Sequence, residues 1–202
     1  IVGVHDREAI LSAVTGVGPR SLHSAFAGGP AAPDAGRFRL TPPHTAYLRV
    51  SEGCSQKCTF CTIPSIRGPL RSKLPGDVLA EARELVADGA VERNVIGQDT
   101  TAYGADLRDD GGPPSLAGLL RDLDALAGLE WIRLLYTYPR RFTDDLIDAI
   151  AECQHVVAYV DMPLQHISTE ILKRMGRGVT RVDIEALLEK LRRRIPGLVL
   201  RT

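Results

Sequence analysis

The stretch Tyr47–Gly68, YLRVSEGCSQKCTFCTIPSIRG, contains three of the four cysteines in this chain of 202 residues. Cys54, Cys58 and Cys61 have the spacing CxxxCxxC and follow a short apolar run that is typical of a strand. Three thiolates on one loop can hold three irons of a cubane iron–sulfur cluster, whereas a fully ligated cluster needs four cysteines. The spacing therefore predicts a metal site in which one iron has no protein ligand.

Two other kinds of site use part of this pattern. Cys58 and Cys61 form a CxxC pair, which occurs in thiol–disulfide oxidoreductases and as half of many zinc sites. A dithiol couple has no use for Cys54, and a structural zinc site usually takes its ligands from two separated pairs. Cys153 has no such partner, and we expect it to be a small buried hydrophobic residue at a helix end. A cubane cluster is the favoured interpretation.

Composition excludes several classes of protein. The chain has 25 basic and 25 acidic residues, and 44% of its residues are hydrophobic, which is ordinary for a globular domain. This charge balance gives no general attraction to nucleic acid or to an anionic membrane. No apolar stretch approaches the roughly 18 residues of a membrane span, and we expect no signal peptide. We therefore expect a cytoplasmic protein whose thiols stay reduced.

The sequence divides into two parts near residue 45. Residues 5–14 have a weak amphipathic period, and residues 16–44 are rich in Gly, Pro, Ala and Ser, as linkers are. The chain does not begin with Met and stops where a strand begins, so we expect a fragment of a longer protein. We expect a helix and linker over 1–45 and a core domain, incomplete at its C-terminus, over 46–202.

Beyond this boundary, apolar runs typical of strands alternate with amphipathic segments typical of helices. Strands of this length that alternate with helices predict right-handed βαβ units and a parallel sheet. The expected fold class is therefore α/β with parallel strands. The expected strands are 47–51, 91–97, 131–137, 155–162 and 198–202; the expected helices are 77–88, 115–128 (ended by Gly128), 143–152 (capped by Thr143), 168–175 and 181–194.

Polar motifs follow four of these expected strands. In parallel α/β folds, and in barrels above all, the carboxyl ends of the strands form the face where ligands bind. We therefore expect motifs that are scattered in the sequence to meet at one edge of the sheet. The motifs are Cys54–Cys61, Gln98 with Asp99, Tyr136–Arg141 and Asp161–His166.

The cysteine motif, with Phe60 before its last cysteine, resembles the signature of the radical S-adenosylmethionine (SAM) superfamily. Within that superfamily, residues 47–72 resemble the methylthiotransferases. The segments most similar to the RimO type, which methylthiolates an aspartate β-carbon of ribosomal protein uS12, are IGQDTTAYG (96–104), YTYPRRFTDDLI (136–147), DMPLQHIS (161–168) and KRMGRGVTR (173–181). This resemblance covers about 45–202 and implies a partial (β/α) barrel of the radical SAM, TIM-like kind.

The resemblance implies a 4Fe–4S cluster on Cys54, Cys58 and Cys61, with SAM on the open iron. In this family the reduced cluster cleaves SAM, and the resulting 5′-deoxyadenosyl radical abstracts hydrogen from an unactivated carbon. Acid or base catalysis does not reach such a bond, so the cofactor performs the difficult step while the protein supplies position and seclusion.

The resemblance also implies contacts to SAM from strand-end residues. Asp99 and Ser168 have an alternative role as helix N-caps, and Arg177 as a surface charge. For the tyrosines of the third motif, structural packing is the commoner role. The candidate cofactor-binding residues are Phe60, Gln98, Asp99, Gln165, Ser168 and Arg177; the candidates for receiving substrate are Tyr136, Tyr138, Arg140, Arg141 and His166.

RimO-type enzymes have parts that we do not find in this sequence. The resemblance implies an N-terminal methylthiotransferase domain with a second cluster, the expected sulfur donor, and a C-terminal TRAM domain as the means of nucleic-acid contact. It also implies uS12 as substrate and an external flavodoxin-like or ferredoxin-like electron donor. We therefore expect this chain alone to be incomplete for turnover.

Two alternative functions stay open. A tRNA adenosine methylthiotransferase of the MiaB type would use the same chemistry, but it would more usually have a GQN loop in place of Gly97-Gln98-Asp99. A non-enzymatic iron–sulfur or zinc module would use the cysteines without SAM.

Overall fold

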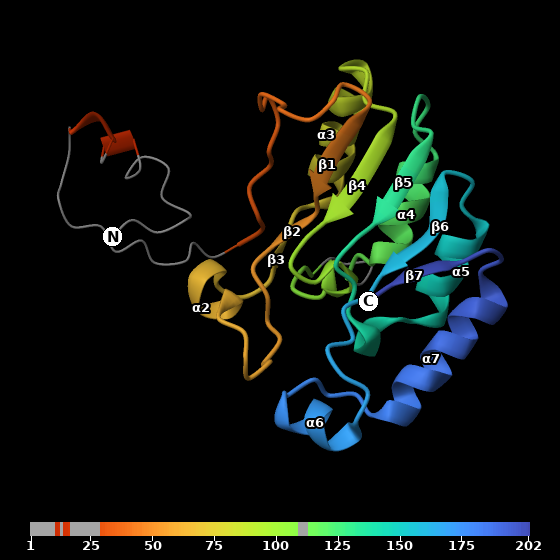
Figure 1. The fold of residues 1–202 in the computed structure, drawn as a ribbon. Helices are drawn as coiled ribbons and strands as arrows, with labels where there is room; N and C mark the ends of the chain where they lie inside the picture. Colours follow the sequence, from red (N-terminus) through yellow and green to blue (C-terminus); the bar gives the residue numbers. More distant parts are fainter. Residues whose placement is uncertain (1–10, 13, 17–28, 109–112) are drawn as a thin grey trace.

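The strands of the main sheet follow the alternation of the sequence. The computed structural model describes residues 11–12, 14–16, 29–108 and 113–202. Within them, five strands form one sheet in which each strand pairs in parallel with the next one of the sheet along the chain (Figure 1). The expected parallel α/β fold is confirmed. The strands are β1 (Thr45–Arg49), β4 (Glu92–Ile96), β5 (Trp131–Leu134), β6 (Val156–Asp161) and β7 (Val199–Arg201).

Amphipathic helices cover one face of this sheet. Three of these helices lie behind the strands in Figure 1 and the fourth lies at the lower right, next to β7, and each is in contact with the next. Between them and the sheet lies the main core, in which apolar side chains from neighbouring strands lie at the same level. These helices are α3 (Pro75–Ala87), α4 (Leu116–Asp124), α5 (Asp144–Glu152) and α7 (Arg181–Arg194). The strand side chains that lie at the same level of the core include Leu48, Val95, Leu134, Val160 and Leu200.

Side-chain hydrogen bonds cap the N-termini of α4, α5 and α7. The Thr143 hydroxyl accepts a hydrogen bond from the Leu146 amide at 3.1 Å, so the predicted cap of α5 is confirmed. The end of α4 was predicted wrongly, because the helix stops at Asp124 rather than at Gly128. There the Leu126 amide donates to the Leu123 carbonyl in a tighter turn, and Gly128, with φ of +80°, belongs to the turn that follows.

The first strand has the expected length but lies two residues earlier than expected. It ends at Arg49, and the chain exchanges partners at Val50, whose amide donates to Ile96 while its carbonyl accepts from Lys73. A short antiparallel ribbon then begins, made of β2 (Ser51–Glu52) and β3 (Arg71–Ser72). Strands of two residues have no hydrophobic period, so the sequence did not predict this ribbon.

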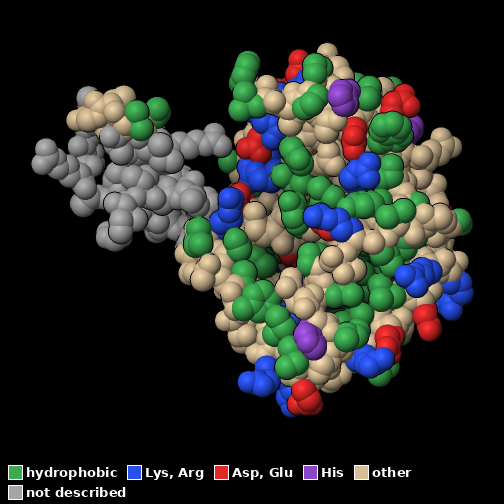
Figure 2. All heavy atoms as spheres, in the orientation of Figure 1, with side chains coloured by type: hydrophobic (Ala, Val, Ile, Leu, Met, Phe, Trp, Pro, Cys, Tyr) green, Lys and Arg blue, Asp and Glu red, His purple; other side chains and the backbone are tan. Residues whose placement is uncertain are grey.

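Within the described residues, no helix covers the opposite face of the main sheet, and this face is largely polar. Tyr47, Asn94 and Arg133 are neighbours across it, and the Arg133 guanidinium lies over the Tyr159 ring at 5.0 Å. Figure 2 looks onto this face and shows basic side chains among hydrophobic ones over the sheet. Two short helices, α2 (Ile63–Arg67) and α6 (Thr169–Arg174), lie beyond the carboxyl ends of the strands (Figure 1). No helix of the described residues is both long and apolar enough to cross a membrane.

A buried ionic cluster attaches the segment before β1 to the domain. The Lys73 ammonium is fully buried and donates to both Glu81 carboxylate oxygens, at 2.5 and 2.7 Å, and to Asp34 at 3.0 Å. Arg49 also binds Asp34, with two hydrogen bonds of 2.9 Å. Burial would raise the pKa of Asp34, but the hydrogen bonds from Arg49 and Lys73 outweigh it and lower the pKa to about 2.

The described part of the expected linker, residues 29–44, has no helix or strand but is not loose. The Ala31 amide donates to the Ser72 carbonyl at 3.0 Å, and the Asp34 amide donates to the Glu81 carboxylate at 2.8 Å. The weak helix predicted over 5–14 falls mostly outside the described residues.

We predict that Lys73→Met destabilises the domain by about 3–5 kcal/mol, because it leaves the buried Glu81 carboxylate without its cation. Urea unfolding of the protein without any bound iron–sulfur cluster, followed by circular dichroism, measures this change. Arg83→Met on the exposed face of α3 is the control, and we expect it to change stability by less than about 0.5 kcal/mol. Equal effects of the two substitutions would contradict a stabilising role for the buried cluster.

Candidate functional site

The three clustered cysteines lie on the loop between β2 and α2, at the carboxyl edge of the main sheet. Cys54 is 8% exposed, Cys58 and Cys61 are partly buried, and all are free thiols. Burial raises the pKa of the Cys54 thiol, and the nearby Asp99 raises it further. Within the described parts of the chain, no set of three His, Cys, Asp or Glu side chains converges on a single ion. A cubane cluster does not require that convergence, because each thiolate binds a different iron.

The backbone of this loop is shaped by Gly53. Its φ is +77°, and a Cβ at this position would lie 2.2 Å from the Pro69 carbonyl oxygen and 2.7 Å from that of Gly68. Only glycine fits here without movement of the backbone. The next residue, Cys54, donates its amide to the Gly68 carbonyl at 3.0 Å, so the start of the loop is bound to its end.

Asp99 joins the cysteine loop to the loop after β4. One oxygen of its buried carboxylate accepts from the Gln56 side-chain amide at 2.8 Å, and the other accepts from the Thr101 hydroxyl at 2.6 Å. Asp99 also occupies the N-cap position of a short 3₁₀ helix, Thr100–Ala102, but its side chain makes no capping hydrogen bond. Asp99 is therefore held by Gln56 and Thr101, and it does not act as a side-chain N-cap.

Further hydrogen bonds join the loop after β4 to the loop after β5. The Thr100 amide donates to the Tyr136 carbonyl at 3.0 Å, and the Tyr138 amide donates to the Thr101 hydroxyl at 3.1 Å. Burial is the main cause that raises the pKa of Tyr138, to about 12, so its phenol stays protonated at neutral pH. The Tyr138 hydroxyl is therefore available as a hydrogen-bond donor at this edge of the sheet.

Asp161 continues these connections to the last two strands. Its carboxylate accepts from the Tyr136 amide at 3.1 Å and from Arg201 at 3.2 Å, and its carbonyl accepts from Thr137. The expected meeting of the four polar motifs at one edge of the sheet is thus present as a continuous hydrogen-bonded rim. We call it the carboxyl rim; it comprises the loops that contain Cys54–Cys61, Gln98–Thr101, Tyr136–Tyr138 and Asp161–Ser168.

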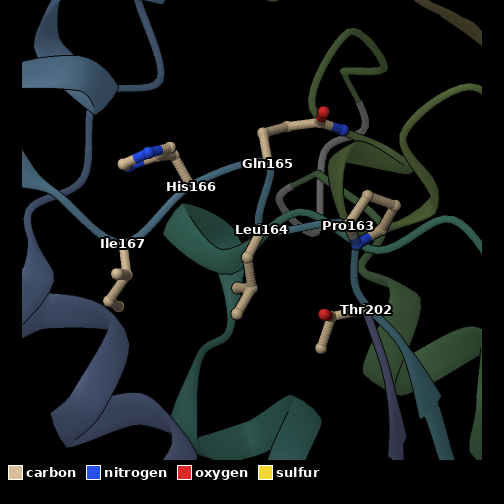
Figure 3. Close-up of a pocket in the computed structure, with 6 residues that line it drawn as sticks. All are labelled: Pro163, Leu164, Gln165, His166, Ile167 and Thr202. Carbon is tan, nitrogen blue, oxygen red and sulfur yellow. The ribbon is translucent and has the colours of Figure 1, made fainter.

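Two residues of the carboxyl rim have strained backbones. Tyr136 has φ of +58° and Gln165 has φ of +72°, although neither is a glycine. Such conformations cost of order 1–3 kcal/mol and gather at functional sites. Gln165 and His166 line an open pocket of about 380 Å³ with Pro163, Leu164, Ile167 and Thr202, and their side chains extend in different directions (Figure 3).

The remaining candidates occupy distinct places around the carboxyl rim. Phe60 is 51% exposed on the tight turn between Cys58 and Cys61. Ser168 occupies the N-cap position of α6, where its side chain makes no capping hydrogen bond. Arg177 is 5% exposed, so the alternative role as a surface charge is wrong.

Two buried polar atoms of the candidate set lack hydrogen-bond partners among the described residues. They are the side-chain oxygen of Gln98 and the Nε of Arg177. Buried polar groups are almost always paired, and an unpaired one calls for a specific explanation. A bound polar ligand at the carboxyl rim would supply hydrogen-bond partners of the kind that these atoms lack, so the residues present fit a cofactor at this place.

Sequence reasoning missed the residues that join the loops to one another. Gln56 and Thr59 lie between the cysteines and are not among the candidates from the sequence, yet Gln56 binds Asp99 and the Thr59 amide donates to the Met175 carbonyl at 3.0 Å. Thr101 bridges two loops through one hydroxyl. Their spacing in the sequence has no period that predicts these contacts.

Comparison with known proteins places these observations in a family. Residues 48–202 match the model of the radical SAM superfamily. The chain is 50% identical over 169 residues to the ribosomal protein uS12 methylthiotransferase RimO of Geotalea uraniireducens and 52% identical over 166 residues to that of Geobacter sulfurreducens. These alignments cover 84% and 82% of the chain but 37% and 36% of the relatives, so the chain spans little more than a third of their length.

Solved structures agree in fold. The radical SAM methyltransferase TsrM from Kitasatospora setae has a TM-score of 0.59 and 20% identity, with 78% of this chain and 30% of TsrM covered. The cobalamin-dependent SAM radical enzyme OxsB has a TM-score of 0.59 and 15% identity, with 77% of this chain and 23% of OxsB covered. At these identities the likeness concerns the fold alone, and it confirms the expected partial barrel.

We predict that Gly53→Ala prevents the cysteine loop from binding iron while the domain stays folded. The positive φ alone would cost alanine about 1–3 kcal/mol, and the clash with Pro69 adds to it. Iron and sulfide content after anaerobic reconstitution measures the effect. The control is Gly76→Ala, because a Cβ there meets no atom within 4 Å. Full iron content in the Gly53 variant would contradict the requirement for glycine at this position of the loop.

Proposed function

Because this chain belongs to the radical SAM superfamily, we propose that Cys54, Cys58 and Cys61 hold a 4Fe–4S cluster whose open iron takes SAM. One observation carries the proposal: the three cysteines follow the first parallel strand, on a rim that also presents the unpartnered buried atoms of Gln98 and Arg177. When bound, the cluster supplies the electron that generates a 5′-deoxyadenosyl radical from SAM.

The residues of the chain would then bind and orient the cofactor. Gln98 would satisfy its buried side-chain oxygen on a donor of SAM, and Asp99 would support the cysteine loop through its hydrogen bond with Gln56. The exposed ring of Phe60 is available for stacking. The proposed cofactor contacts are Phe60, Gln98, Asp99, Gln165, Ser168 and Arg177.

We propose further that the whole protein is a radical SAM methylthiotransferase that forms 3-methylthioaspartate in ribosomal protein uS12. Support comes from the identity of about half of the aligned residues to proteins named for this activity. A soluble ribosomal substrate fits a cytoplasmic location and an external flavodoxin-like or ferredoxin-like electron donor. Residues 1–45 would lead from an N-terminal domain with the second cluster, and 46–202 would be a radical SAM core that is incomplete at its C-terminus. The rest of the core and a TRAM domain would follow.

We predict that the chain takes up iron and sulfide during anaerobic reconstitution and shows a reducible cubane signal that SAM perturbs. Electron paramagnetic resonance (EPR) of the reduced protein measures both properties. Cys58→Ala should abolish the normal signal because it removes a ligand, whereas Cys153→Ala should retain it, since Cys153 lies at the end of α5. A single bound zinc ion, or a cluster signal that does not respond to SAM, would overturn the proposal.

A separate experiment tests the substrate. With the full-length gene product, SAM, sulfide and a reductant, we expect mass spectrometry to detect a methylthio group on an aspartate of uS12. The matched reaction uses tRNA in place of uS12 and should give no product. Modification of tRNA alone would instead assign the protein to the MiaB type.

A further inference from the structure

Three loops of the carboxyl rim meet at one buried side chain, that of Arg177. Its Nη1 lies 3.7 Å from the Cys58 sulfur, within hydrogen-bonding distance for sulfur, and its Nη2 donates to the Pro163 carbonyl at 2.5 Å. The guanidinium also stacks on the Tyr138 ring, 4.2 Å from its centre. The Tyr138 hydroxyl in turn donates to the Arg177 carbonyl. The cation is therefore held in one orientation from several sides.

Arg177 has an unusual electrostatic environment. Among the described residues it forms no ion pair with a carboxylate, although it is 5% exposed. Burial of a charge is costly unless the charge is paired. The group of opposite charge that it does contact is Cys58, once that cysteine is deprotonated as a metal ligand. The Cys58 thiolate would therefore supply the negative charge that the buried guanidinium requires.

The backbone around Arg177 holds it close to the cysteine loop. Gly176 has φ of +68°, and a Cβ there would lie 2.6 Å from the Lys57 carbonyl oxygen, so a side chain would separate the two segments. Thr59 binds the same segment through its amide, to Met175, and through its hydroxyl, to the Arg174 carbonyl at 3.1 Å. These contacts fix the distance between the guanidinium and the Cys58 sulfur.

We infer that Arg177 is a positioning residue that raises the reduction potential of the cluster by donating a charge-assisted hydrogen bond to the Cys58 thiolate. The inference rests on the proposed function, because it requires a cluster on these cysteines. Reduction adds one negative charge to the cluster, and a fixed cation beside one of its sulfurs stabilises the reduced state more than the oxidised state. The same guanidinium links that sulfur to Pro163, which lines the pocket with Gln165.

The test is an anaerobic redox titration of the reconstituted chain without SAM, followed by EPR. Arg177→Met and Arg177→Gln remove the charge, and we expect both to shift the midpoint potential in the negative direction. Arg177→Lys keeps the charge but loses the forked geometry, so it should recover part of the shift. Arg174→Met is the matched control, because it removes an exposed arginine from the same segment and should leave the potential unchanged.

The outcomes separate this inference from the proposed function. If the parent chain forms no cubane cluster, the proposed function itself fails. If the cluster forms but the neutral variants keep the parental potential, or Arg174→Met shifts it equally, the role of Arg177 is overturned. If both neutral variants fail to retain the cluster, Arg177→Lys decides. Recovery of the cluster supports an electrostatic role, and its absence in the lysine variant overturns that role.

Discussion

The site depends on hydrogen bonds that join the loops of the carboxyl rim to one another. A parallel sheet places its strand ends at one edge but does not determine the conformation of the loops that follow them. Here Asp99 holds the cysteine loop, Thr101 holds the loop after β5, and Asp161 holds that loop to the last strands. The loops therefore form one connected frame, and a displacement of one of them is resisted by its neighbours.

The polar residues of this frame are of two kinds: some are bound by other parts of the protein, and some are left available to a ligand. Asp99 and Asp161 have protein partners for their oxygens, as structural carboxylates do. Gln98 and Arg177 instead retain unpartnered buried atoms, and Tyr136 and Gln165 retain strained backbones. Unsatisfied and strained groups are costly to the fold, and all four of these residues are candidates for contact with cofactor or substrate.

Much of this architecture could be predicted from local sequence, because strands, helices and caps leave periodic or chemical signals. The alternation of apolar runs predicted the parallel sheet, Thr143 predicted the start of α5, and the cysteine spacing predicted a metal site. The ribbon of β2 and β3 could not be predicted, since two residues carry no period. Nor could the bridges through Gln56 and Thr101, because they join residues that are distant in sequence and depend on how separate loops pack. The burial of Arg177 was missed for the same reason.

The buried ionic cluster around Lys73 has a consequence for how far the part of the chain that precedes it can extend from the domain. The Gly-, Pro-, Ala- and Ser-rich composition alone predicts that residues 16–44 form a flexible linker. Asp34 and Ala31 are instead attached to Glu81 and Ser72, and Ser72 lies in the ribbon that closes the cysteine loop. A tether that is anchored at Ala31 is shorter by the whole anchored stretch. A short tether keeps whatever it carries at a high effective concentration near its anchor, and in this chain the anchor includes the β2–β3 ribbon, which leads into the cysteine loop.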